Sequence, residues 1–113
     1  MRPGEAWESM ACQFLIDHGL ELVVRNFRIP YGEIDLIMRD GNTLVFVEVK
    51  YRSSERYGNP LEVVTRQKQQ KIKLVASVYL EKLTVVPCVR FDVVGIVPDR
   101  SEYRITWVKG AFE

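Results

Sequence analysis

The stretch "GEIDLIMRDGNTLVFVEVKYR", from Gly32 to Arg52, consists of two apolar segments separated by Asp40–Gly41. An Asp-Gly pair between apolar runs is a strong signal for a β-hairpin. The stretch therefore predicts one strand at about 33–39 and a partner strand at 43–51.

The remainder of the chain predicts two helices and three more strands. Apolar residues recur at helical spacing over about 4–17 and 66–82, with Gly19 expected to end the first helix and Thr65 to cap the second. Further strands are expected at 21–29, 88–97 and 103–108. This α-β-β-β-α-β-β order predicts an α/β protein with a mixed sheet flanked by helices. A length of 113 residues suits a single domain with one core.

The composition narrows the class of protein and the chemistry open to it. The hydrophobic fraction of 47% and the charged fraction of 27% are ordinary for a soluble globular protein. Neither a membrane span nor a secretory signal is visible. The two cysteines, Cys12 and Cys88, lie in apolar segments and are expected to be reduced core thiols of a cytoplasmic protein. With His18 as the one histidine, catalysis is expected to depend on carboxylates, Lys and Arg.

Four charged residues are set into the apolar hairpin strands: Glu33, Asp35, Glu48 and Lys50. Ionised groups in an apolar setting are costly unless they are paired, hydrogen-bonded or bound to metal. Side chains alternate along a strand, so Glu48 and Lys50 share a face, and the hairpin can bring Asp35 beside Glu48. Paired carboxylates raise each other's pKa, and a divalent cation such as Mg²⁺ removes that penalty. The lysine would then position the attacking water or stabilise charge on a phosphoryl group.

The strand by itself is equally consistent with a simple ion pair between Glu48 and Lys50 on an edge strand, where charges deter aggregation. Asp35 on the paired strand, and Glu8 at the border of the first helix's apolar stripe, favour the metal site. Glu33 is interpreted as the polar start of its strand, with a supporting role toward Lys50 or Arg52.

Basic residues gather between Lys50 and Lys73, where seven bases face two acids, while the rest of the chain has nine bases and thirteen acids. Such a block suggests a surface for an anionic partner, although a solvated helix face is the commoner explanation. Its position just after Glu48-x-Lys50 favours a track for phosphates.

The spacing of an acid followed by Glu-x-Lys, after an α-β-β-β start, resembles the PD-(D/E)xK nuclease superfamily. The segments "GEIDLI", "VFVEVKYR" and "RFDVV", together with Tyr57–Gly58, resemble more closely the YraN family of small bacterial proteins. This resemblance runs from the first helix to "WVKGAF". It implies a restriction-endonuclease-like fold with an αβββαβ core over residues 1–113, near the archaeal Holliday-junction resolvases.

Carried over residue by residue, the resemblance implies that Asp35 and Glu48 are metal ligands and that Lys50 is the catalytic lysine. It also implies a metal-ligating glutamate on the first helix. Glu8 matches that position, although Trp7 stands where family members have glycine, and Glu5 is the alternative. The residues implied to contact nucleic acid are Arg52, Lys68 and Lys71.

We therefore expect a Mg²⁺- or Mn²⁺-dependent endonuclease that hydrolyses phosphodiester bonds in DNA, branched DNA included. Cutting a four-way junction needs two active sites, so that substrate implies a homodimer. The alternative is a nuclease fold that binds nucleic acid, or a protein partner, without cutting.

Overall fold

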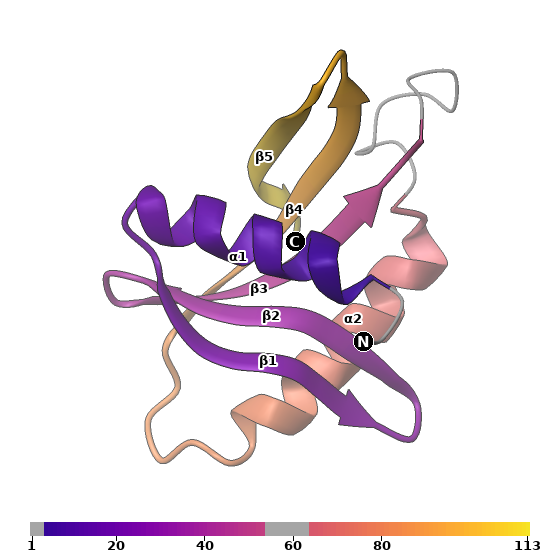
Figure 1. The fold of residues 1–113 in the computed structure, drawn as a ribbon. Helices are drawn as coiled ribbons and strands as arrows, with labels where there is room; N and C mark the ends of the chain where they lie inside the picture. The colour runs from indigo at the N-terminus through magenta and orange to yellow at the C-terminus, as the bar shows by residue number, and fades with distance from the viewer. Residues whose placement is uncertain (1–3, 54–63) are drawn as a thin grey trace.

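The computed structural model describes residues 4–53 and 64–113. Tyr57–Gly58 and part of the basic block lie outside the described residues. The described chain forms two helices and five strands in the expected order (Figure 1). They are α1 (Glu5–Asp17), β1 (Glu21–Ile29), β2 (Gly32–Asp40), β3 (Thr43–Tyr51), α2 (Arg66–Leu80), β4 (Cys88–Asp99) and β5 (Glu102–Phe112).

The five strands form one mixed sheet in the order β1-β2-β3-β4-β5. β3 and β4 run parallel, and the other neighbouring strands are antiparallel. The hairpin forms around Asp40–Gly41, with Asp40 opposite Thr43 and Gly41 in the left-handed region at φ 61°. The expected α/β fold with a helix-flanked mixed sheet is confirmed, and its element order is compatible with a restriction-endonuclease-like fold.

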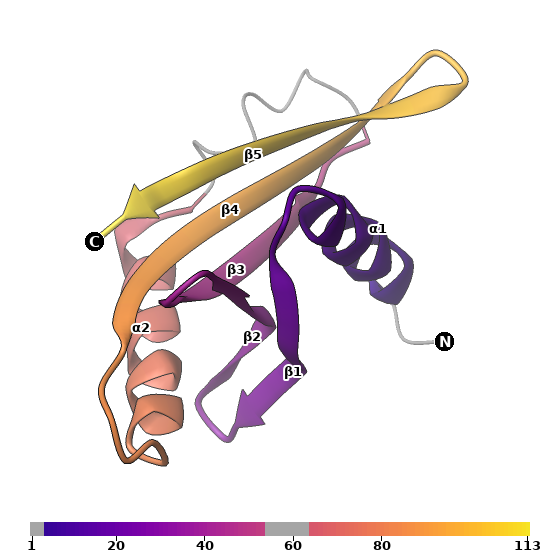
Figure 2. The ribbon, with the colours of Figure 1, turned by 90° about the vertical axis from the view of Figure 1, so that its left-hand side faces the viewer.

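The two helices cover opposite faces of the sheet (Figure 2). On the α1 face, Ala11, Cys12 and Leu15 pack against strand residues that include Val45 and Val47. On the α2 face, the buried helix residues Ile72, Val75 and Ala76 pack against a second set that includes Phe46. Alternate residues of β3 therefore face different helices, which determines where its charged side chains point.

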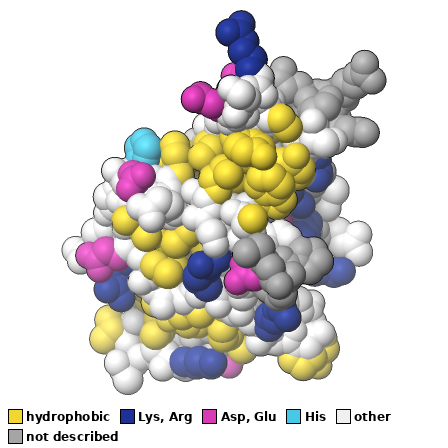
Figure 3. Space-filling model, viewed as in Figure 1, with side chains coloured by type: hydrophobic (Ala, Val, Ile, Leu, Met, Phe, Trp, Pro, Cys, Tyr) yellow, Lys and Arg dark blue, Asp and Glu magenta, His cyan; other side chains and the backbone are white. Residues whose placement is uncertain are grey.

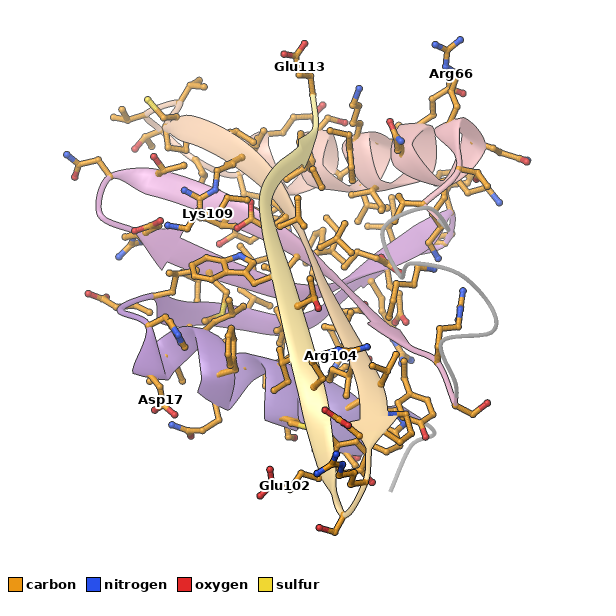
Figure 4. The ribbon with its side chains drawn as sticks, turned by 90° about the horizontal axis from the view of Figure 1, so that it is seen from above. Asp17, Arg66, Glu102, Arg104, Lys109 and Glu113 are labelled. Atoms are coloured by element: carbon orange, nitrogen blue, oxygen red, sulfur yellow. The ribbon has the colours of Figure 1, made fainter. Side chains whose placement is uncertain are left out.

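β3 is the central strand of the sheet, because β2 lies on one side of it and β4 on the other. The structure confirms an ion pair between Glu48 and Lys50, but its expected position on an edge strand is wrong. β4 and β5 form a long hairpin whose tip carries Glu102, with Glu113 at the opposite end of β5 (Figure 4).

Three details differ from the sequence predictions. α2 ends at Leu80 rather than near Lys82, because the N–H groups of Lys82 and Leu83 bond to carbonyls three residues back and tighten the last turn. β5 continues to Phe112, which pairs with Phe91. Cys88 is exposed at the first position of β4, so its prediction as a core thiol was wrong, whereas Cys12 is buried. Neither α1 nor α2, the helices of the described chain, has the length and hydrophobicity of a membrane-spanning helix.

Candidate active site

The site begins where β2 separates from β3. Their paired register runs from Asp40 opposite Thr43 to Leu36 opposite Val47. Asp35 follows directly, and its Oδ2 accepts a hydrogen bond from the backbone N–H of Val49 at 2.8 Å. A side-chain carboxylate thus continues the line of hydrogen bonds between the strands, and this bond holds Asp35 beside β3.

Glu48 and Lys50 lie on the part of β3 that continues alongside β4, opposite Val93 and Gly95. They alternate with Val47 and Val49, which pack on the α1 face, so Glu48 and Lys50 belong to the α2 face. Lys50 Nζ lies 3.6 Å from Glu48 Oε1. The shared face expected from strand alternation is confirmed.

Lys68 reaches the same carboxylate from α2. Its Nζ also lies 3.6 Å from Glu48 Oε1, and its side chain keeps 44% exposure against 9% for that of Glu48. Thr65 Oγ1 accepts a hydrogen bond from the backbone N–H of Lys68, which confirms Thr65 as the N-cap and places Lys68 in the first turn. Asp35, Glu48, Lys50 and Lys68 are called the charge cluster below.

Asp35 is a member of the charge cluster whose pKa is shifted. Burial and the neighbouring Glu48 carboxylate raise the pKa of Asp35 from 3.8 to about 7, while the bond from Val49 N–H lowers it; Glu8 and Glu33 raise it further. Glu48 has two ammonium groups beside it, whereas Asp35 accepts its hydrogen bond from the neutral amide of Val49. Asp35 is therefore the acid whose ionised form gains most from a cation.

Glu8 approaches from the α1 side of the sheet. Glu8 is only 8% exposed, and its charge contributes to the raised pKa of Asp35. Glu5, one turn earlier, is partly exposed. Of the two candidate residues on α1, Glu8 is the one whose charge raises the pKa of Asp35.

The donor chemistry of the cluster suits Mg²⁺, which binds carboxylate oxygens and usually takes one or two protein carboxylates together with water and substrate phosphate. Asp35 and Glu48 provide two such groups. Across residues 4–53 and 64–113, no three His, Cys, Asp or Glu side chains are grouped as a ready-made metal site. The structure therefore brings Asp35 and Glu48 together with Lys50, but it does not gather Glu8 into a compact set of three ligands.

The other predicted site residues are Arg52, Lys71 and Glu33. Arg52 follows β3, and its backbone N–H bonds to Ile96 O while its guanidinium bonds to Tyr51 O. Lys71 is exposed on α2. Glu33 lies at the start of β2 and pairs with Arg28 at 2.7 Å, a partner that the sequence reasoning had not named.

Among the described residues, the face shown in Figure 3 carries no uninterrupted field of basic side chains. On the face shown in Figure 3, Lys and Arg side chains alternate with acidic and hydrophobic ones. Arg66 points away from the body of the protein at the start of α2 (Figure 4). The basic residues relevant to the site are thus the few that border the charge cluster.

Asn26 is a site neighbour that sequence reasoning missed. It lies in β1 between Arg25, opposite Leu36, and Phe27, opposite Ile34, which places its backbone across from Asp35. Its φ is 54°, and its buried Oδ1 has no hydrogen-bond partner among the described residues. Asparagine is disfavoured in strands but tolerates positive φ. An asparagine in the middle of a predicted strand was therefore the sequence signal for an irregular backbone at this position.

The fold and the cluster together define a class: an α/β protein with a restriction-endonuclease-like element order, in which two buried acids and two lysines meet beside the central strand. The model of the family described as "Uncharacterised protein family UPF0102" matches residues 7–96. The chain belongs to this family, and the resemblance to the YraN family is confirmed.

Relatives align over nearly the whole chain. A UPF0102 protein of Shewanella amazonensis is 42% identical over 113 residues, which cover 99% of this chain and 100% of the relative. A UPF0102 protein of Hahella chejuensis is 47% identical over 112 residues, covering 96% of this chain and 88% of the relative. A third, from Chromohalobacter salexigens, is 43% identical, with 99% and 91% covered.

Proposed function

We propose that this protein is a Mg²⁺-dependent endonuclease that hydrolyses phosphodiester bonds in DNA, branched DNA included. The observation that carries the proposal is the placement of Asp35 beside Glu48, with Lys50 on the same face as Glu48, at the point where β2 leaves β3. Mn²⁺ is expected to replace Mg²⁺. The proposal includes a cytoplasmic location, supported by the free thiols of Cys12 and Cys88.

Each residue has a distinct role in this proposal. Asp35 and Glu48 would hold the cation, which supplies Lewis-acid polarisation of the phosphate. Lys50 donates hydrogen bonds to the attacking water and stabilises negative charge as the phosphodiester is cleaved. Its side chain is only 15% exposed, so its charge is less screened by solvent than that of a surface lysine.

Neighbouring basic residues would hold the DNA backbone. Lys68 borders Glu48, Lys71 follows on α2, and Arg52 lies at the end of β3. Contacts of this kind bind phosphates and carry no base sequence, so we expect preference for DNA structure over sequence. Cleavage of a four-way junction would require a homodimer, because each chain supplies one site.

A cleavage assay tests the proposal. Labelled single-stranded, duplex and four-way-junction DNA are incubated with wild type, Lys50→Met and Lys73→Met, with Mg²⁺, Mn²⁺ or EDTA. Lys73 is an exposed lysine on α2 and serves as the matched loss of charge. We expect metal-dependent cleavage of at least one substrate, about 10²-fold slower in Lys50→Met and nearly unchanged in Lys73→Met. Intact substrates with wild type, or a fully active Lys50→Met, would refute the proposal.

A second function is a non-catalytic module that binds nucleic acid. It is favoured by the two ammonium groups 3.6 Å from Glu48 Oε1, which neutralise that carboxylate without metal. This alternative predicts salt-sensitive DNA binding that is retained in Asp35→Asn, with no cleavage by either protein. A protein-interaction module would show neither DNA binding nor metal binding.

A further inference from the structure

A cavity lies beside the charge cluster, between the β1–β2 turn and α2. Its volume is about 240 Å³, and its lining residues are Tyr31, Gly32, Glu33, Lys68, Lys71, Ile72 and Val75. The turn approaches the helix closely, since a Cβ added to Gly32 would lie 3.3 Å from Val75 Cγ2. Figure 2 shows the turn beside α2. Lys68 belongs to both the cavity wall and the charge cluster, so the two sites adjoin.

The walls of the cavity differ in chemistry. Ile72 and Val75 are buried, at 3% and 0% exposure, and form an apolar side. Lys68 and Lys71 provide two positive charges from successive turns of α2. The Glu33 carboxylate is paired with Arg28 at 2.7 Å, which offsets its charge next to the lysines. The two lysine charges and the apolar side together favour an anionic ligand with an apolar part.

Tyr31 adds a planar group at the rim. It is 73% exposed, and unlike Trp7, which stacks on Tyr51 at 3.9 Å, it has no described ring partner among residues 4–53 and 64–113. An exposed aromatic ring next to lysines is the combination by which proteins bind single-stranded nucleic acid, because bases stack on the ring while cations contact phosphates. A free phosphate would use the lysines but neither the ring nor the apolar side.

We infer that this cavity binds one unpaired nucleotide of the DNA strand, adjacent to the phosphate at the charge cluster. Lys71 and Lys68 contact the phosphates on either side of this nucleotide, and its base stacks on Tyr31. A base inside a duplex is already stacked and paired, so it offers no free face to the ring. The inference rests on the proposed function for its position next to the cut, and it narrows the substrate to DNA with an unpaired nucleotide at that point.

Binding in EDTA tests the cavity separately from cleavage. Fluorescein-labelled oligo-dT of about 12 nucleotides, the same strand in a dA·dT duplex, and oligo-rU are titrated with wild type, Tyr31→Ala, Tyr31→Phe, Lys71→Ala and Lys73→Ala. Tyr31→Phe keeps the ring. Lys73→Ala removes an equal charge from an exposed position of α2 that is not among the cavity-lining residues.

We expect wild type to bind the single strand more tightly than the duplex. Tyr31→Ala should lose about thirtyfold in single-strand affinity, the middle of the range for one stacked base, with duplex affinity unchanged. Tyr31→Phe should match wild type. Lys71→Ala should weaken both forms and reduce the slope of log affinity against log salt by about one, whereas Lys73→Ala should have the smaller effect.

The inference is overturned if Tyr31→Ala binds the single strand as well as wild type, or if it weakens duplex binding equally. Tighter binding of oligo-rU than of oligo-dT would overturn DNA as the ligand. Parallel cleavage assays with Mg²⁺ separate the two proposals. If the protein cleaves DNA but binding does not depend on Tyr31, nucleotide binding in the cavity is rejected and the endonuclease proposal stands. If binding depends on Tyr31 but no DNA is cleaved, nucleotide binding in the cavity is supported and the endonuclease proposal is rejected.

Discussion

The pKa of Asp35 is determined by burial, by repulsion from Glu48 and by a backbone hydrogen bond. Its carboxyl group lies near Glu48 and accepts the N–H of Val49, and its pKa is raised to about 7. A group that changes charge near neutral pH responds strongly to a bound cation, because an opposite charge favours its ionised form. The same property makes the stability of the protein depend on pH.

The direction of that dependence follows from the two pKa values. Between 3.8 and about 7 the folded protein holds a proton on Asp35 that the unfolded chain has released. The free energy of unfolding therefore falls as pH rises through this interval, by at most about 1.4 kcal/mol per pH unit from this group. The stabilisation is complete below 3.8 and lost above about 7.

Asp35→Asn should remove this dependence while keeping an oxygen that accepts the Val49 N–H. In EDTA we expect the variant to be more stable than wild type at about pH 8, with the difference shrinking toward about pH 4. Urea denaturation at both pH values measures it. Asp99→Asn, at the exposed end of β4, is the control. A difference that does not change with pH would contradict the raised pKa.

At the residue scale the sequence predicted the pairs that follow from strand alternation. Glu48 and Lys50 share a face, and the hairpin turn brings Asp35 to the same point. Asn26 and Tyr31 could not be predicted in this way. The first depends on a local positive φ within β1, and the second on how closely the β1–β2 turn approaches α2.

At the scale of elements, α2 positions Lys68 through its first turn. Thr65 caps the helix, and Lys68 is the residue whose N–H the cap binds at 3.1 Å. The cap therefore stabilises the same turn that directs the Lys68 ammonium toward Glu48. This part of the site was predictable, because a threonine before a helical apolar pattern is a recognised start signal.

Thr65→Ala should lower the free energy of unfolding by about 1 kcal/mol, since an N–H of the first turn loses its acceptor. Thr65→Ser should retain most of the stability. Chemical denaturation of the three proteins measures the effect. If the alanine and serine variants were equally stable, the side-chain cap would have no role in stability.

The central position of β3 could not be deduced from its own sequence. The apolar residues of β3 are compatible with any buried strand, and its charged residues are also compatible with a strand at the edge of the sheet. The position depends on β4 returning parallel to β3 after α2, a long-range pairing that the element order permits but does not specify.

At the scale of the whole molecule, a buried polar network joins the β4–β5 hairpin to the rest of the sheet. Asp92, with 0% exposure, accepts hydrogen bonds from Arg90, from Trp107 Nε1 and from Gly110 N–H. Arg90 also bonds to Asp40 at 2.9 Å. Strand alternation places Arg90 and Asp92 on one face, where they form a salt bridge at 2.9 Å, but the sequence did not indicate the contributions of β5 and Asp40.

Asp92→Asn should be strongly destabilising, by about 3–5 kcal/mol, because it removes the charge that compensates Arg90 and offers N–H groups where donors already point. Asp99→Asn, in the same strand but exposed, should change stability by less than about 0.5 kcal/mol. Denaturation curves for both variants test this. Equal stability of the two would show that the Asp92 network contributes little.

In the proposed function, Asp35 and Glu48 together bind one divalent cation. Calorimetric titration of Mn²⁺ into wild type and Asp35→Asn, at about pH 7 in two buffers of different ionisation enthalpy, tests it most directly. We predict one Mn²⁺ per chain in wild type, proton release as Asp35 ionises, and about tenfold or greater loss of affinity in Asp35→Asn. Absence of Mn²⁺ binding to wild type, or equal binding to both proteins, would contradict the claim.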